Sequence, residues 1–153
     1  MEFDIKMDAG SLSGFVLYHN YVRPGGIIGV FLSVAAIVAL IIRWDDWTGV
    51  QRCLLIILAL LFLVFQPLML LQKANTQLRS GVFDKPMHYE FGDDEFSISQ
   101  GTSKETFKYA DIRKTVIHKK VIYIYMTTVS AFIIPKNQCE DVFDGVIGRI
   151  KKG

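Results

Sequence analysis

The side chains that most often carry out catalysis or bind metals are few in this chain and widely spaced. His19, His88 and His118 stand in separate segments, and none of them belongs to an HExxH, HxxxH or CxxC pattern. Zinc ligands in proteins recur at such short spacings. The chain also has no GxSxG nucleophile elbow, no phosphate-binding loop and no dinucleotide fingerprint. We therefore expect a protein that is not an enzyme and uses neither a metal nor a cofactor.

Two acidic runs have spacings that do not suit a cation site. Asp45 and Asp46 are adjacent in a short polar link that contains no His or Cys. The run 93–95 (Asp-Asp-Glu) lacks the alternating spacing of an EF-hand loop and is typical of a hairpin turn. We expect both runs to be solvated turns.

The most suggestive polar cluster is basic. Arg113, Lys114, Lys119 and Lys120 surround one expected hairpin. At a cytoplasmic membrane surface, each cation would gain about 1 kcal/mol from anionic headgroups. The alternative is a solvated turn whose lysines discourage pairing at strand edges, because neighbouring acidic residues dilute the local field. The solvated turn is the simpler interpretation, and contact with anionic lipid is the functional one.

The clearest structural elements in the sequence are two long apolar runs. The runs, 25–42 and 53–71, contain no charged residue and are joined by a short polar link. At about 1.5 Å per residue, each forms a helix close to the roughly 30 Å hydrocarbon thickness of a bilayer. The second run lacks the polar stripe of a long soluble helix, and no signal-peptide cleavage pattern follows the first. The sequence predicts a transmembrane helical hairpin over 24–71, with the lipid bilayer as its partner.

The charges that flank the hairpin predict its topology. Five cations lie outside it and two lie in the link, namely Lys6, Arg23, Lys73, Arg79 and Lys85 against Arg43 and Arg52. Because cytoplasmic flanks are enriched in Lys and Arg, we expect both termini in the cytoplasm and the hairpin in the cell inner (plasma) membrane. The net charge of +2 is too small to indicate binding to nucleic acid.

Small residues line one side of the first run. Gly25, Gly29 and Ser33 recur every four residues, with Ala36 on nearly the same face. In lipid, this spacing lets helix backbones approach closely, and that packing drives association. The simplest use of the face is to receive the second run. A homodimer or a partner protein is the alternative occupant.

The segments on either side of the hairpin are predicted separately. Residues 1–23 alternate at first and then show helical spacing, which predicts a half-buried strand and a juxtamembrane helix capped by Asp8. Pro67 removes a backbone donor and should kink the second apolar helix near its end. Residues 72–85 extend that helix into a linker, and Ser80-Gly81 ends it.

Residues 86–153 are typical of a small β-rich domain. Apolar runs separated by turn residues predict six short strands in an antiparallel meander, at 87–91, 95–99, 105–109, 113–118, 121–126 and 130–134. Asn137 is expected to begin a C-terminal amphipathic helix, with Glu140 in a capping-box position. Arg149, Lys151 and Lys152 suit the negative end of that helix.

Four short motifs resemble a known family. They are Leu17-Tyr18-His19, Tyr89-Glu90-Phe91-Gly92-Asp93-Asp94, Tyr109-Ala110-Asp111-Ile112 and Ile133-Ile134-Pro135-Lys136. The chain resembles the bacterial YcxB-like proteins, whose members join a two-helix membrane hairpin to a C-terminal domain similar to a pleckstrin-homology-like (PH-like) barrel. Many relatives carry Trp where this chain has Tyr109. The resemblance implies a fold and carries no chemistry to particular residues.

Together these patterns predict an α+β membrane protein, in which a transmembrane hairpin is joined to a small antiparallel PH-like barrel or meander closed by a C-terminal helix. We expect a non-enzymatic tether whose cytoplasmic module binds a protein segment, through pairing at a sheet edge, or a lipid headgroup. The alternatives are an accessory subunit of a membrane transport or export assembly, and an immunity or stress-protection protein.

Overall fold

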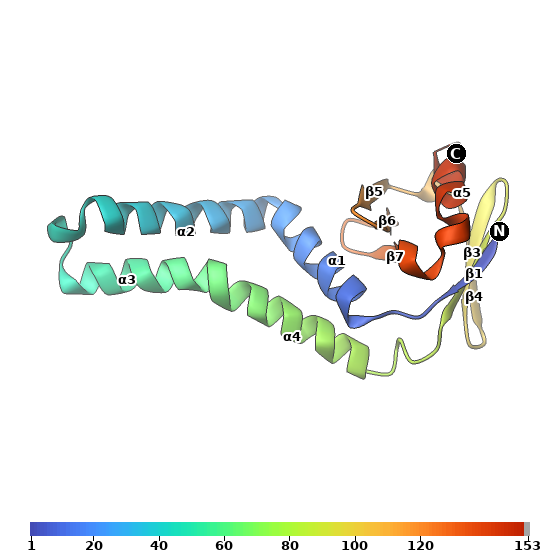
Figure 1. Cartoon of the computed structure of the whole chain (residues 1–153), viewed down its shortest axis with the longest axis horizontal. Coiled ribbons are helices and arrows are strands. Elements are labelled where there is room, and N and C mark those ends of the chain that lie inside the picture. The colour runs from blue at the N-terminus through green and yellow to red at the C-terminus, as the bar shows by residue number, and fades with distance from the viewer. Residues whose placement is uncertain (152–153) are drawn as a thin grey trace. The chain divides into compact units, whose positions relative to one another are not determined.

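The computed structural model describes residues 1–151 and divides the chain into two compact units (Figure 1). The β unit comprises Met1–Leu12 and Gln77–Gly153, and the helical unit comprises Ser13–Thr76. The helical unit is therefore an insertion within the β unit. Lys152, which the sequence places at the end of the last helix, lies outside the described residues.

Two long helices make up most of the helical unit. After α1 (Ala9–Val22), helix α2 (Pro24–Ile42) is followed by a second continuous helix that runs from Gly49 to Arg79. Both are long and apolar enough to cross a membrane by length and composition. The second one consists of α3 (Gly49–Leu60), a π-helical turn (Leu61–Phe65) and α4 (Gln66–Arg79).

The second helix begins four residues before its apolar run. Thr48 caps it, because its side-chain oxygen accepts from Gln51 N at 3.4 Å while Gln51 Oε1 accepts from Thr48 N at 2.9 Å. Arg52 thus lies within the helix. Its Nε donates to Trp44 O at 3.0 Å, and its guanidinium lies 4.6 Å from the centre of the Trp44 ring. The polar link, which includes a 3-10 turn at Trp44–Asp46, is closed by these contacts.

The irregularity expected at Pro67 takes the form of the π-helical turn just before it. Proline lacks an N–H, and its ring collides with the carbonyl one turn earlier in a regular α-helix. A π turn relieves this collision locally. The helix then continues and ends at Ser80-Gly81, as predicted, where Gly81 has a φ of +81°.

The β unit contains two antiparallel sheets. Sheet A has the order β1-β2-β3-β4, and sheet B has the order β5-β6-β7. Their strands are β1 (Glu2–Ile5), β2 (Met87–Phe91), β3 (Glu95–Gln100), β4 (Ser103–Lys108), β5 (Lys114–His118), β6 (Val121–Tyr125) and β7 (Ala131–Pro135). All six strands predicted after the hairpin are present, with ends that differ by at most two residues. Strand β6 is central in its sheet.

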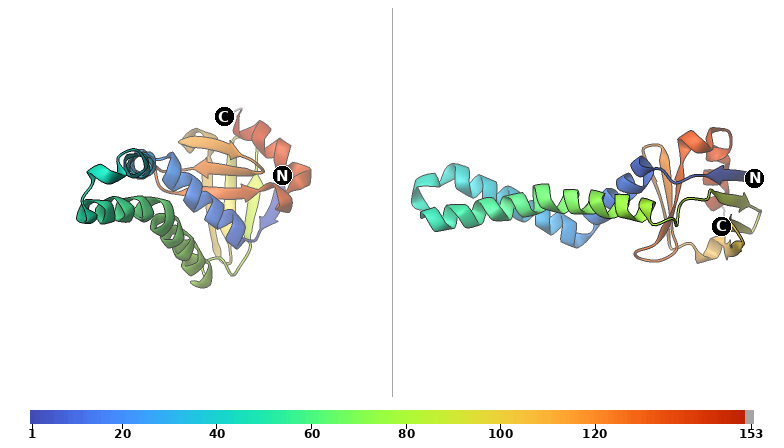
Figure 2. Two further views of the ribbon diagram at one scale, coloured as in Figure 1. Left: turned by 60° about the vertical axis from the view of Figure 1, so that its left-hand side comes forward. Right: turned by 90° about the horizontal axis from the view of Figure 1, so that it is seen from below.

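The prediction of a closed barrel is wrong. A 3-10 turn at Tyr109–Asp111 separates β4 from β5, so the chain leaves sheet A before sheet B begins. The Tyr109 hydroxyl donates to Gly92 O at 2.9 Å, which holds this corner. Figure 2 shows the strands of the two sheets crossing one another rather than continuing around one sheet.

Stacked aromatic rings form much of the core between the sheets. Phe91 stacks on Phe96 with 5.3 Å between ring centres, and Phe3 lies 5.6 Å from Tyr89 and 5.7 Å from Phe91. These rings come from β1, β2 and β3. Ile122 and Ile124 of β6 are fully buried in the same cluster, so both sheets contribute to one core.

The capping box expected at Asn137 is also wrong. Residues Lys136–Gln138 form a 3-10 turn, and α5 (Glu140–Ile150) begins after Cys139 without a side-chain cap. Burial raises the pKa of the Cys139 thiol to about 11, and the protonated Sγ donates to Pro135 O at 3.4 Å. The predicted apolar face of the helix is present, because Phe143 and Val146 are buried in the core.

Candidate functional site

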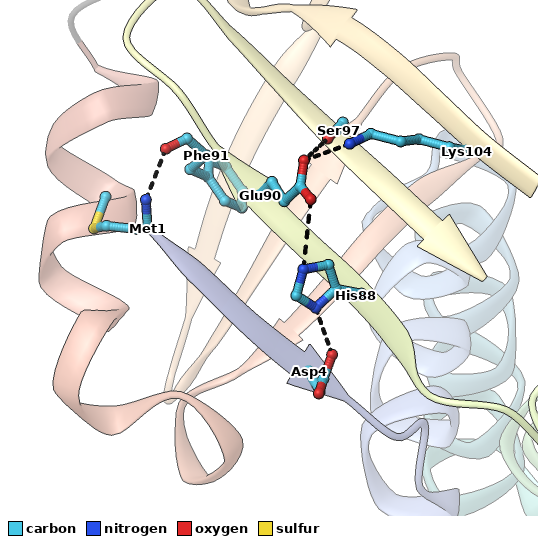
Figure 3. Close-up of polar contacts among 7 residues, drawn as sticks. All are labelled: Met1, Asp4, His88, Glu90, Phe91, Ser97 and Lys104. Carbon is cyan, nitrogen blue, oxygen red and sulfur yellow. Dashed lines mark hydrogen bonds and ion pairs between the residues drawn. The ribbon is translucent and has the colours of Figure 1, made fainter. Parts of the chain in front are cut away.

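A row of polar side chains crosses the outer face of sheet A (Figure 3). We call it the sheet A network: Asp4, His88, Glu90, Ser97 and Lys104. His88 Nδ1 lies 2.7 Å from Asp4 Oδ1, and His88 Nε2 lies 3.6 Å from Glu90 Oε1. Ser97 Oγ donates to Glu90 Oε2 at 2.8 Å, and Lys104 Nζ donates to the same oxygen. The network joins all four strands of the sheet.

Strand register brings these residues together. Asp4 is paired with His88, and Glu90 is paired with Ser97. Because side chains alternate between faces along a strand, these residues all point away from the aromatic core. The network could not be predicted from the sequence, since β1 and β2 lie on opposite sides of the hairpin in the chain. The only sequence signal was the alternation of polar residues in each strand.

The charged side chains of the network link β1 to β2 at the surface, and their geometry does not suit catalysis. Each ring nitrogen of His88 faces a different carboxylate, so the ring has no nitrogen directed at a nucleophile or substrate. Within residues 1–151, no group of three or more His, Cys, Asp or Glu side chains can hold a metal ion.

Glu90 is the member of the network with a shifted acidity. Hydrogen bonds from Lys104 and then from Ser97 lower the pKa of the Glu90 carboxyl below its ordinary value of 4.5. The folded state therefore favours the ionised carboxylate more strongly than the unfolded state does. This contribution to stability is present above pH 4.5 and is lost as the pH falls through the folded-state pKa.

We predict that Glu90→Gln makes the stability of the β unit less sensitive to acid. The wild-type midpoint of chemical unfolding should fall as the pH drops below 4.5, whereas the variant should start lower and change less. Glu105→Gln, on β4 and outside the network, is the matched control and should follow the wild type. Parallel pH profiles for Glu90→Gln and the wild type would contradict the prediction.

The four cations of the predicted basic cluster are all exposed, and they lie in two pairs. Lys119 and Lys120 form the two-residue turn between β5 and β6, where Lys119 has a φ of +54°. Arg113 and Lys114 lie at the other end of β5. At about 3.3 Å per residue, roughly 15 Å of strand separates the pairs. The pairs are farther apart than the screening length of about 8 Å in physiological salt.

The small residues of α2 have different surroundings. Ser33 is fully buried, and its Oγ donates to Leu58 O on α3 at 3.4 Å. A Cβ atom added to Gly29 would lie 2.8 Å from Phe62 Cε1 and closer still to Cδ1. A Cβ atom added to Gly25 would meet nothing within 4 Å. Gly29 and Ser33 therefore face the second helix, and Gly25 faces open space.

The exit from β1 is held by Gln138, a residue for which the sequence predicts no role. Its side-chain amide accepts from Lys6 N at 2.8 Å and donates to Lys6 O at 2.9 Å, as a neighbouring strand would. Its Nε2 also lies 3.3 Å from Asp8 Oδ2. Asp8 in turn accepts from Ser11 N at 2.8 Å, which confirms its predicted role as the cap of α1.

One stretch of the chain matches a known protein family. Residues 91–144 match the family model described as YcxB-like protein. This stretch runs from the end of β2 into α5 and includes three of the four sequence motifs in whole or in part. No curated protein and no solved structure matches the chain. The predicted resemblance is confirmed for this stretch, and the chain carries a YcxB-like domain in residues 91–144.

Proposed function

We propose that this chain is an integral membrane protein whose two apolar helices anchor a PH-like β unit, and that the β unit binds a protein segment or an anionic lipid headgroup. The observation that carries the anchoring is the exposure of apolar side chains on the long helices. Phe31, Ile41 and Val50 expose 71%, 75% and 72% of their surface. The core helix of a soluble protein is mostly buried, whereas lipid is a favourable environment for such a surface.

The degree of burial separates the two long helices from ordinary core helices. In the most apolar 18-residue windows, 28% of residues are buried in the first helix and 6% in the second. The β unit, by contrast, covers its own aromatic core. Exposing the helices to water would be unfavourable, whereas lipid would accommodate them. A bilayer therefore suits the helical unit, and water suits the β unit.

Strand pairing supports a topology with both ends of the hairpin on one side of the membrane. β1 precedes the helical unit, β2 follows it, and Ile5 is paired with Met87 where the chain leaves and returns. The two strands can pair only if both are on the same side. The distribution of cations favours the cytoplasmic side of a bacterial inner membrane.

The PH-like assignment rests on the composition of the β unit. A four-stranded and a three-stranded antiparallel sheet enclose one core, and a C-terminal helix contributes buried residues to it. The exposed cations and the open sheet edges support the proposed role as a binding module. These features suit recognition of a chain or headgroup better than turnover of a substrate.

Extraction and labelling test the proposal. Washing membranes with alkaline carbonate should leave the full chain in the pellet. In a Cys53→Ser background, Asp45→Cys in the link should react with an impermeant maleimide on intact cells, whereas Ser80→Cys should react only after permeabilisation. Cys139, which is buried, serves as the internal negative control. Release by carbonate would refute the anchoring, and the reverse labelling pattern would refute the orientation.

A further inference from the structure

Four strands of the β unit lie at sheet edges: β1, β4, β5 and β7. An edge strand presents a row of backbone N–H and C=O groups with no partner in its own sheet, and such a row can pair with an extended peptide. The four edges differ in how well they are protected from such pairing.

Three edges carry a feature that opposes the addition of a strand. At the end of β1, Gln138 already occupies the N–H and C=O groups of Lys6. β7 ends at Pro135, which has no N–H to donate. On β4, Lys104, Glu105 and Lys108 are exposed charges of both signs, and no large apolar side chain is exposed.

The edge of β5 is different. His118 and Val121 flank a two-residue turn, so His118, Val116 and Lys114 form the alternate hydrogen-bonded pairs with β6. The backbone groups of Thr115 and Ile117 consequently point away from β6, toward the open edge. This places two peptide units with outward donors and acceptors along the middle of β5.

An incompletely covered apolar side chain lies on the same edge. Ile117 is paired with Ile122, which is fully buried, yet 45% of Ile117 is exposed. Among the strand residues that the structure describes, Ile117 is the one large apolar side chain in the exposed class. A strand added beside β5 would cover this side chain as well as pair with its backbone.

The charges around the edge select the partner. Arg113 and Lys114 lie at one end of β5, and Lys119 and Lys120 lie at the other. We infer that the open edge of β5 binds an extended segment of a partner protein that has apolar residues at its centre and acidic residues at both ends. A second copy of β5 would bring like charges together, so this edge disfavours pairing with itself.

The inference rests on the proposed function and specifies the partner of the β unit. A strand rises about 3.3 Å per residue, and the cation pairs are roughly 15 Å apart. A segment that reaches both pairs therefore has about seven residues. Main-chain hydrogen bonds would hold the segment in register, and Ile117 would contact an apolar side chain. The cations would repel basic chains and favour acidic chains over neutral ones.

The test uses the full chain in neutral detergent micelles and a fluorescent peptide, Asp-Asp-Val-Thr-Val-Asp-Glu. Fluorescence anisotropy should show saturable binding, and the Thr115 and Ile117 amides should become at least about tenfold slower in hydrogen exchange. Peptides N-methylated at successive central positions should lose binding by about tenfold at alternate positions only, because alternate N–H groups face β5. Lys119→Gln with Lys120→Gln should weaken binding by about tenfold. The matched pair Lys85→Gln with Lys108→Gln, two exposed cations outside the sheet A network, should not.

Three results would overturn the inference. The first is a peptide that does not bind, and the second is binding that is insensitive to N-methylation and leaves both amides unprotected. The third is a wild-type protein that binds phosphatidylglycerol vesicles but not the peptide, together with a Lys119→Gln, Lys120→Gln variant that no longer binds the vesicles. That result would assign these cations to a lipid headgroup. Any of these leaves the membrane anchoring intact, because carbonate extraction tests it separately.

Discussion

Replacing residues 1–8 with a Gly-Ser sequence of equal length is expected to unfold the β unit, although every other strand and α5 remain. Ile5 is fully buried, Met7 is nearly so, and Phe3 stacks on both Tyr89 and Phe91. At about 1.5–3 kcal/mol for each of these three apolar side chains, the loss is roughly 4.5–9 kcal/mol. A whole domain is stable by only about 5–15 kcal/mol.

The loss of β1 should be visible as rapid proteolysis within residues 86–151 and as loss of cooperative thermal unfolding in detergent. The matched control is the double substitution Glu2→Ser, Lys6→Ser, which changes two polar side chains of the same segment. It should alter stability by no more than about 0.5 kcal/mol. A β unit that stays protease-resistant without its first strand would contradict the expectation.

The same reasoning predicts a soluble form of the β unit. Joining residues 1–8 to residues 85–151 by a short Gly-Ser linker should give a monomer that unfolds cooperatively, because Ile5 and Met87 are already paired at that end of the sheet. Residues 85–151 alone should not fold. If both forms fold equally well, the helical insertion would not separate two parts of one cooperative unit.

Much of the fold was predictable because its determinants are local. Alternating apolar residues and turn residues located each strand, and the strand at 87–91 has the predicted bounds. Two uncharged runs located the long helices. Helix starts were less predictable. The second helix begins before its apolar run because Thr48 caps it in a capping box, which the pattern of polar and apolar residues does not reveal.

The features that sequence reasoning missed depend on contacts between distant segments. The sheet A network requires the register of β1 against β2, which a helical insertion separates. The capping box at Asn137 was wrong because the chain there forms a 3-10 turn that ends in Gln138, whose side chain pairs with Lys6. The barrel was wrong because the Tyr109–Asp111 turn divides the meander into two sheets. Strand count alone does not distinguish these arrangements.

Gly29→Leu is expected to destabilise the helical hairpin by about 2–3 kcal/mol, whereas Gly25→Leu should leave it unchanged. The side chain at Gly29 would enter the space held by the Phe62 ring, and overpacking of this kind typically costs about 1–3 kcal/mol. In the proposed bilayer, close packing is a principal source of helix association, so a forced separation would have further cost. At Gly25 the new side chain meets nothing within 4 Å.

A compensating substitution identifies the contact. Phe62→Ala combined with Gly29→Leu should recover at least half of the lost stability, because removing the phenyl ring leaves room for the leucine side chain. Ser33→Leu should also be destabilising, since it removes the hydrogen bond to Leu58 O and enlarges a fully buried residue. Unfolding by sodium dodecyl sulfate in mixed micelles, followed through Trp44 and Trp47 fluorescence, measures each variant.

The comparison between the two glycines separates packing within one chain from packing between chains. If α2 packs on α3 of the same chain, the effect of Gly29→Leu on stability is independent of protein concentration, and Gly25→Leu has no effect. If the glycine face served a homodimer, both substitutions would destabilise, and the effect would grow on dilution by mass action. The contact of Gly29 with Phe62, together with the open space at Gly25, favours the first outcome.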